Sequence, residues 1–212
     1  MSLVLVDVDG TLVAGPGTER LFLRHLLRRG ALGPRQLGAA LRFACAEAIR
    51  PEGLPLKRNK AWLAGLQVDE VAERARRFVD ETLLPRVRPE MRARLDGHRG
   101  RGDRVLLLTG TPQFLADPLA AALGLDGGVA TLCASDGTRY IARSPSRHPF
   151  GKTKLDLARD LCQGGDLGEV HAYGDSRHDL ALLGAVGHPV AVAPDAVLRR
   201  RAQEQGWEIL AG

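Results

Sequence analysis

Short apolar runs alternate with helical stretches along most of this chain, and that alternation restricts the possible folds more than any other feature of the sequence. The runs Leu3–Val6 and Val105–Leu108 are continuous, rich in Val and Leu, and followed directly by polar and glycine residues. Such a run is typical of a strand whose two faces are both covered in a parallel sheet. Parallel strands joined by helices predict an α/β fold with a doubly wound, Rossmann-like sheet.

Residues 17–84 have a different pattern. Apolar residues recur there at helical spacing, as in Val71, Ala75 and Phe78, and Pro and Gly interrupt the region at several points. We expect three or four amphipathic helices and no strand, which indicates a helical insertion after the first strand. The predicted organisation is an α/β core formed by residues 1–14 and 85–212 and a small all-helical cap formed by residues 15–84.

The α/β alternation resumes after residue 85. We expect strands at Val105–Leu108, Val170–Tyr173 and Val190–Val192, helices at about 89–98, 112–124, 153–162 and 179–186, and a terminal helix opened by Pro194 and Asp195. Val129–Cys133 and Arg139–Arg143 flank the turn residues Ser135, Asp136 and Gly137, which predicts a β-hairpin.

The charged residues argue against a nucleic-acid partner. The formal net charge of +5 comes from 26 Arg and four Lys against 25 Asp and Glu, and the arginines are spread along the whole chain. Aromatic residues are not interleaved with them, as a surface that stacks on bases would require. We therefore expect solvated helix surfaces and no nucleic-acid binding.

The remaining composition is that of an ordinary globular protein. The three scattered cysteines, Cys45, Cys133 and Cys162, suggest neither a disulfide framework nor a structural zinc site. No stretch approaches the ~20 consecutive apolar residues that span a bilayer, and the first residues lack the basic leader of a signal peptide. We expect no membrane span and a cytoplasmic location.

Unusual polar residues follow three of the predicted strands: Asp7 and Asp9, Thr109, and Asp175 and Asp179. Because ligands bind at the carboxyl ends of strands in open parallel sheets, we expect these side chains to converge on one spot. Hard carboxylate and carbonyl oxygens suit Mg²⁺, which keeps several waters and bridges to phosphate. The oxygens at these strand ends are therefore of a type that suits Mg²⁺.

The segments that carry these residues resemble the four motifs of the haloacid dehalogenase-like superfamily. Asp7–Thr11 is similar to the first motif, hhhDxDGT, Leu107–Gly110 to the second, Gly151-Lys152 to the third, and Gly174–Asp179 to the fourth, GDxxxD. The resemblance covers essentially the whole chain, and the helical insertion matches the superfamily's C1-type cap. The C-terminal part resembles the subgroup close to phosphoserine phosphatase, the IB hydrolases.

This resemblance implies a Mg²⁺-dependent phosphohydrolase acting on a small phosphomonoester. Asp7 would attack phosphorus and form an aspartyl-phosphate, while Asp9 would act as general acid for the leaving alcohol and then as base for water. The metal ligands would be Asp7, the backbone carbonyl of Asp9, and Asp175, with Asp179 just behind them. Thr109 and the Gly110 amide would bind phosphoryl oxygens, and Lys152 would neutralise both Asp7 and the phosphoryl group.

Two alternatives concern the site itself. Lys154 also fits the third motif, because it places Leu157, Ala158 and Leu161 in a helical register, although Lys152 follows a glycine as in the subgroup and is preferred. Phosphoserine phosphatases carry a glutamate nine residues after the nucleophile, where this chain has Pro16, so phosphoserine is not the expected substrate.

The same motifs are compatible with more than one reaction. A phosphotransferase would use the same intermediate with an alcohol in place of water. A non-catalytic phosphoester-binding protein would share the fold but would be expected to lack one of the carboxylates of the first motif or the metal-binding Asp. The dehalogenating branch of the superfamily lacks the carboxylate that Asp9 supplies here, which favours phosphoryl transfer.

Overall fold

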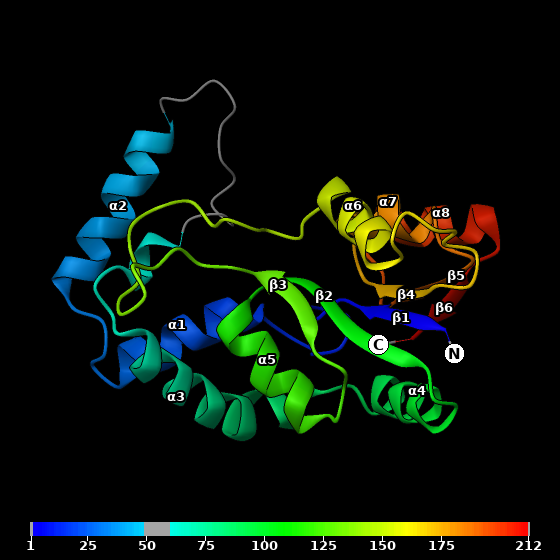
Figure 1. Cartoon of the computed structure of the whole chain (residues 1–212), viewed down its shortest axis with the longest axis horizontal. Helices are drawn as coiled ribbons and strands as arrows, with labels where there is room; N and C mark the ends of the chain where they lie inside the picture. The colour runs from blue at the N-terminus through cyan, green and yellow to red at the C-terminus, as the bar shows by residue number, and fades with distance from the viewer. Residues whose placement is uncertain (1, 49–59, 212) are drawn as a thin grey trace.

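The computed structural model describes residues 2–48 and 60–211, and its centre is a parallel sheet. The six strands of the described residues are β1 (Leu3–Val6), β2 (Arg104–Pro112), β3 (Gly128–Thr131), β4 (His171–Gly174), β5 (His188–Val192) and β6 (Glu208–Leu210). They lie in the order β3-β2-β1-β4-β5-β6, and every pair is parallel (Figure 1). The predicted doubly wound α/β fold is confirmed. The strand order reverses between β1 and β4, where such sheets open a crevice for ligands.

Both faces of the sheet are covered, as the continuous apolar runs predict. Val4 and Val6 point to one face, which is covered by α4 (Pro89–Gly100) and α5 (Gln113–Ala122). Leu5 points to the opposite face, which is covered by α6 (Lys152–Leu161), α7 (Leu180–Leu183) and α8 (Ala196–Gln205), as Figure 1 shows. Successive side chains of a strand alternate between faces, so a strand covered twice must be apolar throughout.

The described part of residues 17–84 is mainly helical, as expected. It forms α1 (Thr18–Arg28), α2 (Pro34–Ala48) and α3 (Val68–Phe78), with short 3₁₀ turns at Ala61–Leu63 and Leu84–Arg86 and a π turn at Val79–Leu83. Phe22 of α1 contacts Phe78 of α3 and Phe114 of α5, with ring centroids 5.1 and 5.6 Å apart. One apolar cluster thus joins the insertion to the sheet, and the division at residues 14/15 and 84/85 stays a prediction.

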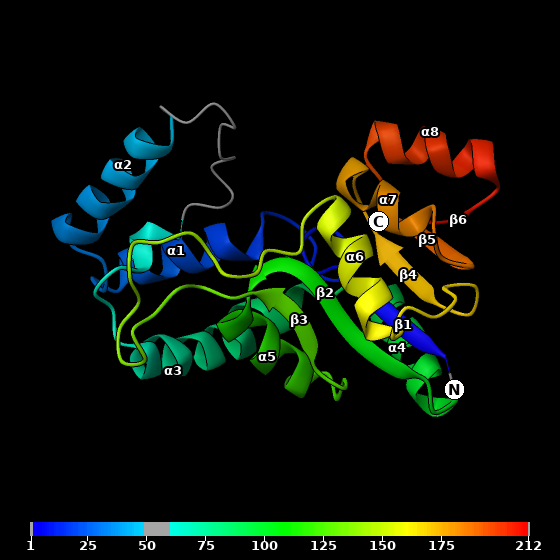
Figure 2. The ribbon, with the colours of Figure 1, turned by 45° about the horizontal axis from the view of Figure 1, so that its top comes forward.

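The predicted hairpin is wrong in its first strand. Val129 belongs to β3, which pairs in parallel with β2. Within the segment that follows, the antiparallel bridges are Leu132–Arg147 and Ser135–Tyr140, and Arg139 bridges to Gln67 of the helical insertion. The segment 132–147, which we call the arm, reaches from β3 to the helical insertion (Figure 2). Its tip turns tightly because the Asp136 carboxylate accepts hydrogen bonds from the Thr138 and Arg139 amides.

The arm pairs with the insertion rather than with a second core strand. The Gly65 amide donates to the Tyr140 carbonyl (2.8 Å), the Tyr140 amide to Leu66 (3.0 Å), and the Val68 amide to Thr138 (2.9 Å). The edge strand β6 was not predicted, because its three residues have mixed polarity.

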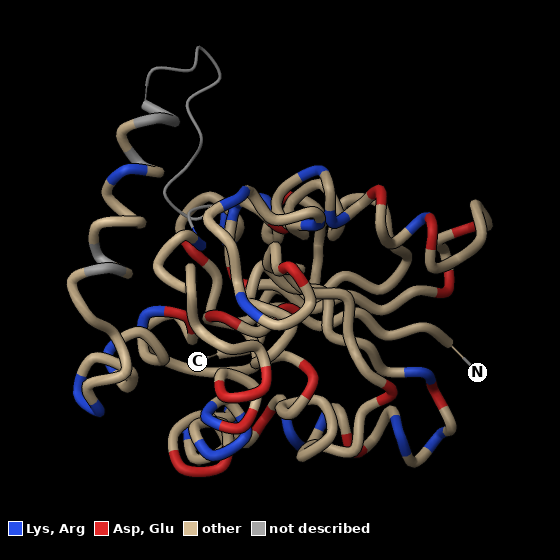
Figure 3. The backbone as a smooth tube through the Cα atoms, turned by 60° about the vertical axis from the view of Figure 1, so that its left-hand side comes forward, with Lys and Arg blue, Asp and Glu red and all other residues tan. Residues whose placement is uncertain are grey.

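Charged residues of both signs are distributed over the described chain (Figure 3). Among the described residues, no helix combines the length and the apolar character needed to cross a bilayer.

Candidate active site

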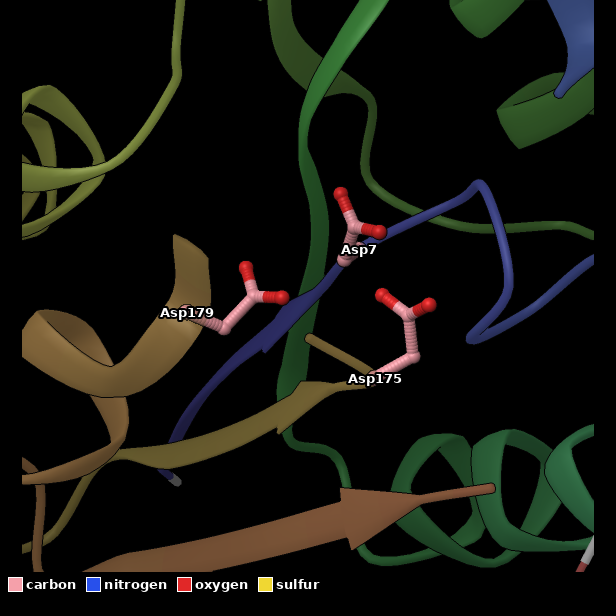
Figure 4. A group of neighbouring side chains, drawn as sticks. All are labelled: Asp7, Asp175 and Asp179. Atoms are coloured by element: carbon pink, nitrogen blue, oxygen red, sulfur yellow. The ribbon is translucent and has the colours of Figure 1, made fainter. Parts of the chain in front are cut away.

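The predicted site residues meet where β1, β2 and β4 end. Asp7 follows β1, Asp175 follows β4, and Asp179 closes the short 3₁₀ turn Arg177–Asp179. Figure 4 shows the three carboxylates pointing toward one another, and one oxygen of each lies within 4.8 Å of the others. The convergence expected from the strand ends is what the structure shows for these three residues.

Two glycines make this close approach possible. A Cβ on Gly10, whose φ is +87°, would stand 2.1 Å from Oδ2 of Asp175. A Cβ on Gly174 would stand 2.6 Å from the Cβ of Asp179. Each glycine of the two motifs therefore leaves space that an acidic side chain fills, and Gly10 also adopts a conformation that other residues rarely take.

The cation of the site is Lys154, and the preference for Lys152 was wrong. The Lys154 ammonium donates to Oδ1 of Asp7 and to Oδ1 of Asp179, at 2.6 Å each, and the residue is only 4% exposed. Lys152 is exposed at the first position of α6. Two residues are about 200° apart around a helix, so only one of the two lysines can face the sheet.

Asp179 is held on both of its oxygens. While Oδ1 accepts from Lys154, Oδ2 accepts from the amide and the hydroxyl of Ser176, at 3.3 and 3.2 Å. This capping arrangement fixes the carboxylate at the start of a helical turn. Asp179 is thereby placed to orient Lys154 beside Asp7.

Asp9 faces the helical insertion. Its Oδ1 accepts from the amide of Thr18, the first residue of α1 (2.7 Å), and its Oδ2 accepts from the hydroxyl of Thr111 (3.2 Å). Sequence reasoning missed Thr18 and Thr111. Nothing marks Thr18, whereas Thr111 lies two residues beyond Thr109 on the same strand and so shares its side.

The second motif lies at the end of β2 and is held by hydrogen bonds between its own residues. The buried Thr109 hydroxyl donates to the Thr111 hydroxyl and accepts from the Thr111 amide, both at 3.2 Å. The Gly110 carbonyl accepts from the Thr131 hydroxyl (2.6 Å), and Nδ1 of His148 lies 2.8 Å from that hydroxyl. Because the hydroxyl gives its single hydrogen to Gly110, His148 must donate from Nδ1. His148 and Thr131 thus support Gly110, a role no sequence pattern signalled.

The charges of the site are unbalanced without a metal ion. Burial raises the pKa of Asp7 to about 6 against the opposing effect of Lys154. Burial, with the nearby Asp7 and Asp179 carboxylates, raises the pKa of Asp175 to about 7. Burial lowers the pKa of Lys154, but the two carboxylates raise it by more, so the ammonium stays charged. Three carboxylates face one ammonium, and clustered hard oxygens of this kind fit a divalent cation such as Mg²⁺.

Known proteins resemble the chain over nearly its whole length. A family model of haloacid dehalogenase-like hydrolases matches residues 4–184. The chain is 29% identical over 225 residues to a histidinol-phosphatase of Neisseria meningitidis, covering 99% of this chain and 98% of that protein. It is 31% identical over 210 residues to a phosphoserine phosphatase of Mycobacterium tuberculosis, covering 96% of this chain and 68% of that protein.

A solved structure also matches. A protein of unknown function from Bordetella pertussis superposes with a TM-score of 0.80 at 26% identity, covering 99% of this chain and 97% of the other. The family match includes every residue of the carboxylate cluster as well as Lys154. The chain therefore belongs to the haloacid dehalogenase-like hydrolase family, and within it to the phosphatases.

Proposed function

We propose that the protein hydrolyses a small phosphomonoester with Mg²⁺ through an aspartyl-phosphate formed on Asp7. The observation that carries the proposal is the Asp7 carboxylate, bonded to the buried Lys154 and clustered with Asp175 and Asp179 at the switch point of the sheet. A phosphomonoester dianion repels nucleophiles, so its charge must be neutralised while the attacking oxygen is held in line. A carboxylate nucleophile beside a fixed ammonium meets both needs.

The first half-reaction breaks the bond between phosphorus and the leaving oxygen. An oxygen of Asp7 attacks phosphorus, and Asp9 gives its proton to the departing alcohol. Lys154 and the Gly110 amide stabilise the charge on the phosphoryl oxygens, and the Thr109 hydroxyl turns from Thr111 to donate to one of them.

The second half-reaction returns the enzyme to its starting state. Asp9 takes a proton from water, whose oxygen attacks the phosphorus of the aspartyl-phosphate, and inorganic phosphate leaves as the Asp7 carboxylate is regenerated. Asp7, the Asp9 carbonyl and Asp175 would hold Mg²⁺, with Asp179 orienting Lys154. The bound cation supplies further neutralisation of the phosphoryl charge.

The helical insertion would act as the cap that selects the leaving group. Two similar proteins are named for different substrates, histidinol phosphate and phosphoserine, so both belong in a substrate panel. Here Pro16 is exposed, and the nearby Glu19 carboxylate is bonded to the Lys60 ammonium and to the Trp62 indole. A glutamate already bound by a cation is poorly placed to bind the amino group of phosphoserine, which disfavours that substrate.

The test is phosphate release from a panel of phosphomonoesters that includes histidinol phosphate and phosphoserine. We expect release with Mg²⁺, none with EDTA, and none from Asp7→Asn. Asp156→Asn makes the same chemical change at an exposed position of α6 and should keep full activity. Normal turnover by Asp7→Asn would show that the proposed nucleophile is wrong. A phosphotransferase would instead give phosphorylated products when an acceptor alcohol is added.

A further inference from the structure

A cavity lies at the opposite end of the sheet from the active site. It is about 640 Å³ in volume and opens between α4 and the first residues of β4, β5 and β6. His171 begins β4, while Asp175 follows the other end of the same strand. The volume is within the usual range for sites that bind small molecules.

The cavity is lined by an unusual concentration of basic groups. Arg94 and His98 come from α4, Arg101 directly follows it, and His171 and His188 come from the adjacent strands β4 and β5. The rings of His171 and His188 stack with centroids 4.3 Å apart, and the ring of His98 lies 4.8 Å from His171. Five side chains that are cationic or can become so therefore border one cavity.

Two carboxylates offset part of the charge of these groups. Glu208 lines the cavity and is paired with Arg94. Oδ2 of Asp103 lies 2.9 Å from Nδ1 of His98 and 3.4 Å from a guanidinium nitrogen of Arg101. Burial lowers the pKa of His171, and the adjacent His98 and His188 lower it further. Each arginine thus has one carboxylate partner, and an anion that enters the cavity must compete for the guanidinium groups.

The donors are also arranged for an anion with several oxygens. Arg94 and Arg101 line the cavity together with the phenol of Tyr173. The phenol hydroxyl lies 2.8 Å from Nε2 of His98. Planar guanidinium groups bind carboxylate and phosphate oxygens in pairs.

We propose that this cavity is a second binding site, for a small polyanion that carries phosphate or carboxylate groups. It is separate from the proposed phosphatase site and does not depend on that function. The polyanion competes with Glu208 for Arg94 and is held from the other side by Arg101 and the histidines.

Trp207 supplies the readout, because it lines the cavity and the chain contains one other tryptophan, Trp62. Metal-free Trp62→Phe protein is titrated with inorganic sulfate, inorganic phosphate and citrate, at constant ionic strength and about pH 6.5, near the ordinary pKa of histidine. Without metal, the carboxylate cluster of the active site repels anions. We expect a saturable change in fluorescence, and the preferred anion distinguishes a phosphate ligand from a carboxylate ligand.

Three variants locate the site. Arg94→Gln should weaken binding by about tenfold or more, the usual effect of losing a charge-assisted hydrogen bond. Glu208→Gln should tighten binding, because it frees Arg94 and removes a repulsive charge. Arg92→Gln makes the same change as Arg94→Gln at an exposed position of α4 that does not line the cavity, and should leave binding unchanged.

Calorimetry of the same titrations detects binding even where the fluorescence of Trp207 does not change. The proposal is overturned if none of the three anions gives a saturable fluorescence change or a heat of binding. It is equally overturned if Arg94→Gln binds as tightly as Arg92→Gln.

Discussion

Replacing Lys154 by Met should destabilise the metal-free protein strongly, whereas Lys152→Met should not. Lys154 lies 2.6 Å from two buried carboxylates, and at an effective dielectric constant of about 20 each such contact is worth ~6 kcal/mol before desolvation. Desolvation of the three ions offsets much of this, and breaking a buried ion pair by removing one partner typically costs about 3–5 kcal/mol. For a chain of this length that corresponds to a fall in melting temperature of roughly 6–20 °C.

The comparison is well matched because both lysines are in α6 and lose the same charge. Methionine keeps most of the length of the lysine side chain, so loss of packing contributes little. Thermal denaturation with EDTA measures the stability, and phosphate release with Mg²⁺ measures the activity. We expect Lys154→Met to lose about 10²–10³-fold in kcat, as for other groups that stabilise developing charge.

The outcome can refute the assignment in either assay. A Lys154→Met protein with normal melting temperature and kcat would contradict the role of this residue. Loss of activity in Lys152→Met, with normal activity in Lys154→Met, would instead support Lys152 as the lysine of the third motif.

Three further changes test other parts of the site. Gly10→Ala should weaken Mg²⁺ binding in a metal titration by about tenfold or more, because its Cβ would meet Asp175, whereas Gly15→Ala, also at positive φ but with open space around it, should not. Thr131→Val should weaken inhibition by inorganic phosphate by roughly tenfold through the lost support of Gly110, and Thr131→Ser should restore it. In thermal denaturation, the metal-free protein should become more stable as pH falls from about 8 to about 5.5. Burial raises the pKa of Asp7 to about 6 and that of Asp175 to about 7 in the folded state. Both values lie above those of the unfolded chain, so the folded state binds more protons and is stabilised as pH falls. Asp175→Asn should reduce this gain, and a loss of stability over the same range would contradict the reasoning.

The sheet could be predicted because its central strands are continuous apolar runs that can be recognised without knowing their partners. Val4, Leu5 and Val6 are each fully buried, so both faces of β1 had to be apolar. The arm carried a misleading signal, since Val129 to Cys133 and Arg139 to Arg143 have the composition of strands around a turn. Their partners are distant in sequence, β2 for Val129 and residues 65–68 for the arm, and local patterns do not report such pairing.

The motif alone was not sufficient to choose between Lys152 and Lys154 as the lysine of the site. Lys152 and Lys154 both lie in α6, and the choice between them depends on the rotation of the helix relative to the sheet. Ala158 is fully buried and lies four residues after Lys154, on the same side of the helix. That small apolar residue marks the buried face, and its spacing favours Lys154 over Lys152 more directly than the preceding glycine favours the reverse.

The hydrogen bonds between the arm and the helical insertion restrict how the insertion could move relative to the core. Glycines 15 and 17 and the segment Pro85–Pro89 suggest a cap that closes on two covalent hinges. The arm adds a third connection, made by three backbone hydrogen bonds and by the Arg139 guanidinium, which donates to the Gly65 carbonyl at 2.7 Å. Breaking four hydrogen bonds costs roughly 2–6 kcal/mol at about 0.5–1.5 kcal/mol each. The motion that keeps these bonds intact carries the arm together with the helical insertion, so the hinge on the core side would lie at the two ends of the arm. Thr18 would then move as well, and its bond to Asp9 would couple the position of the insertion to the carboxylate that must exchange protons.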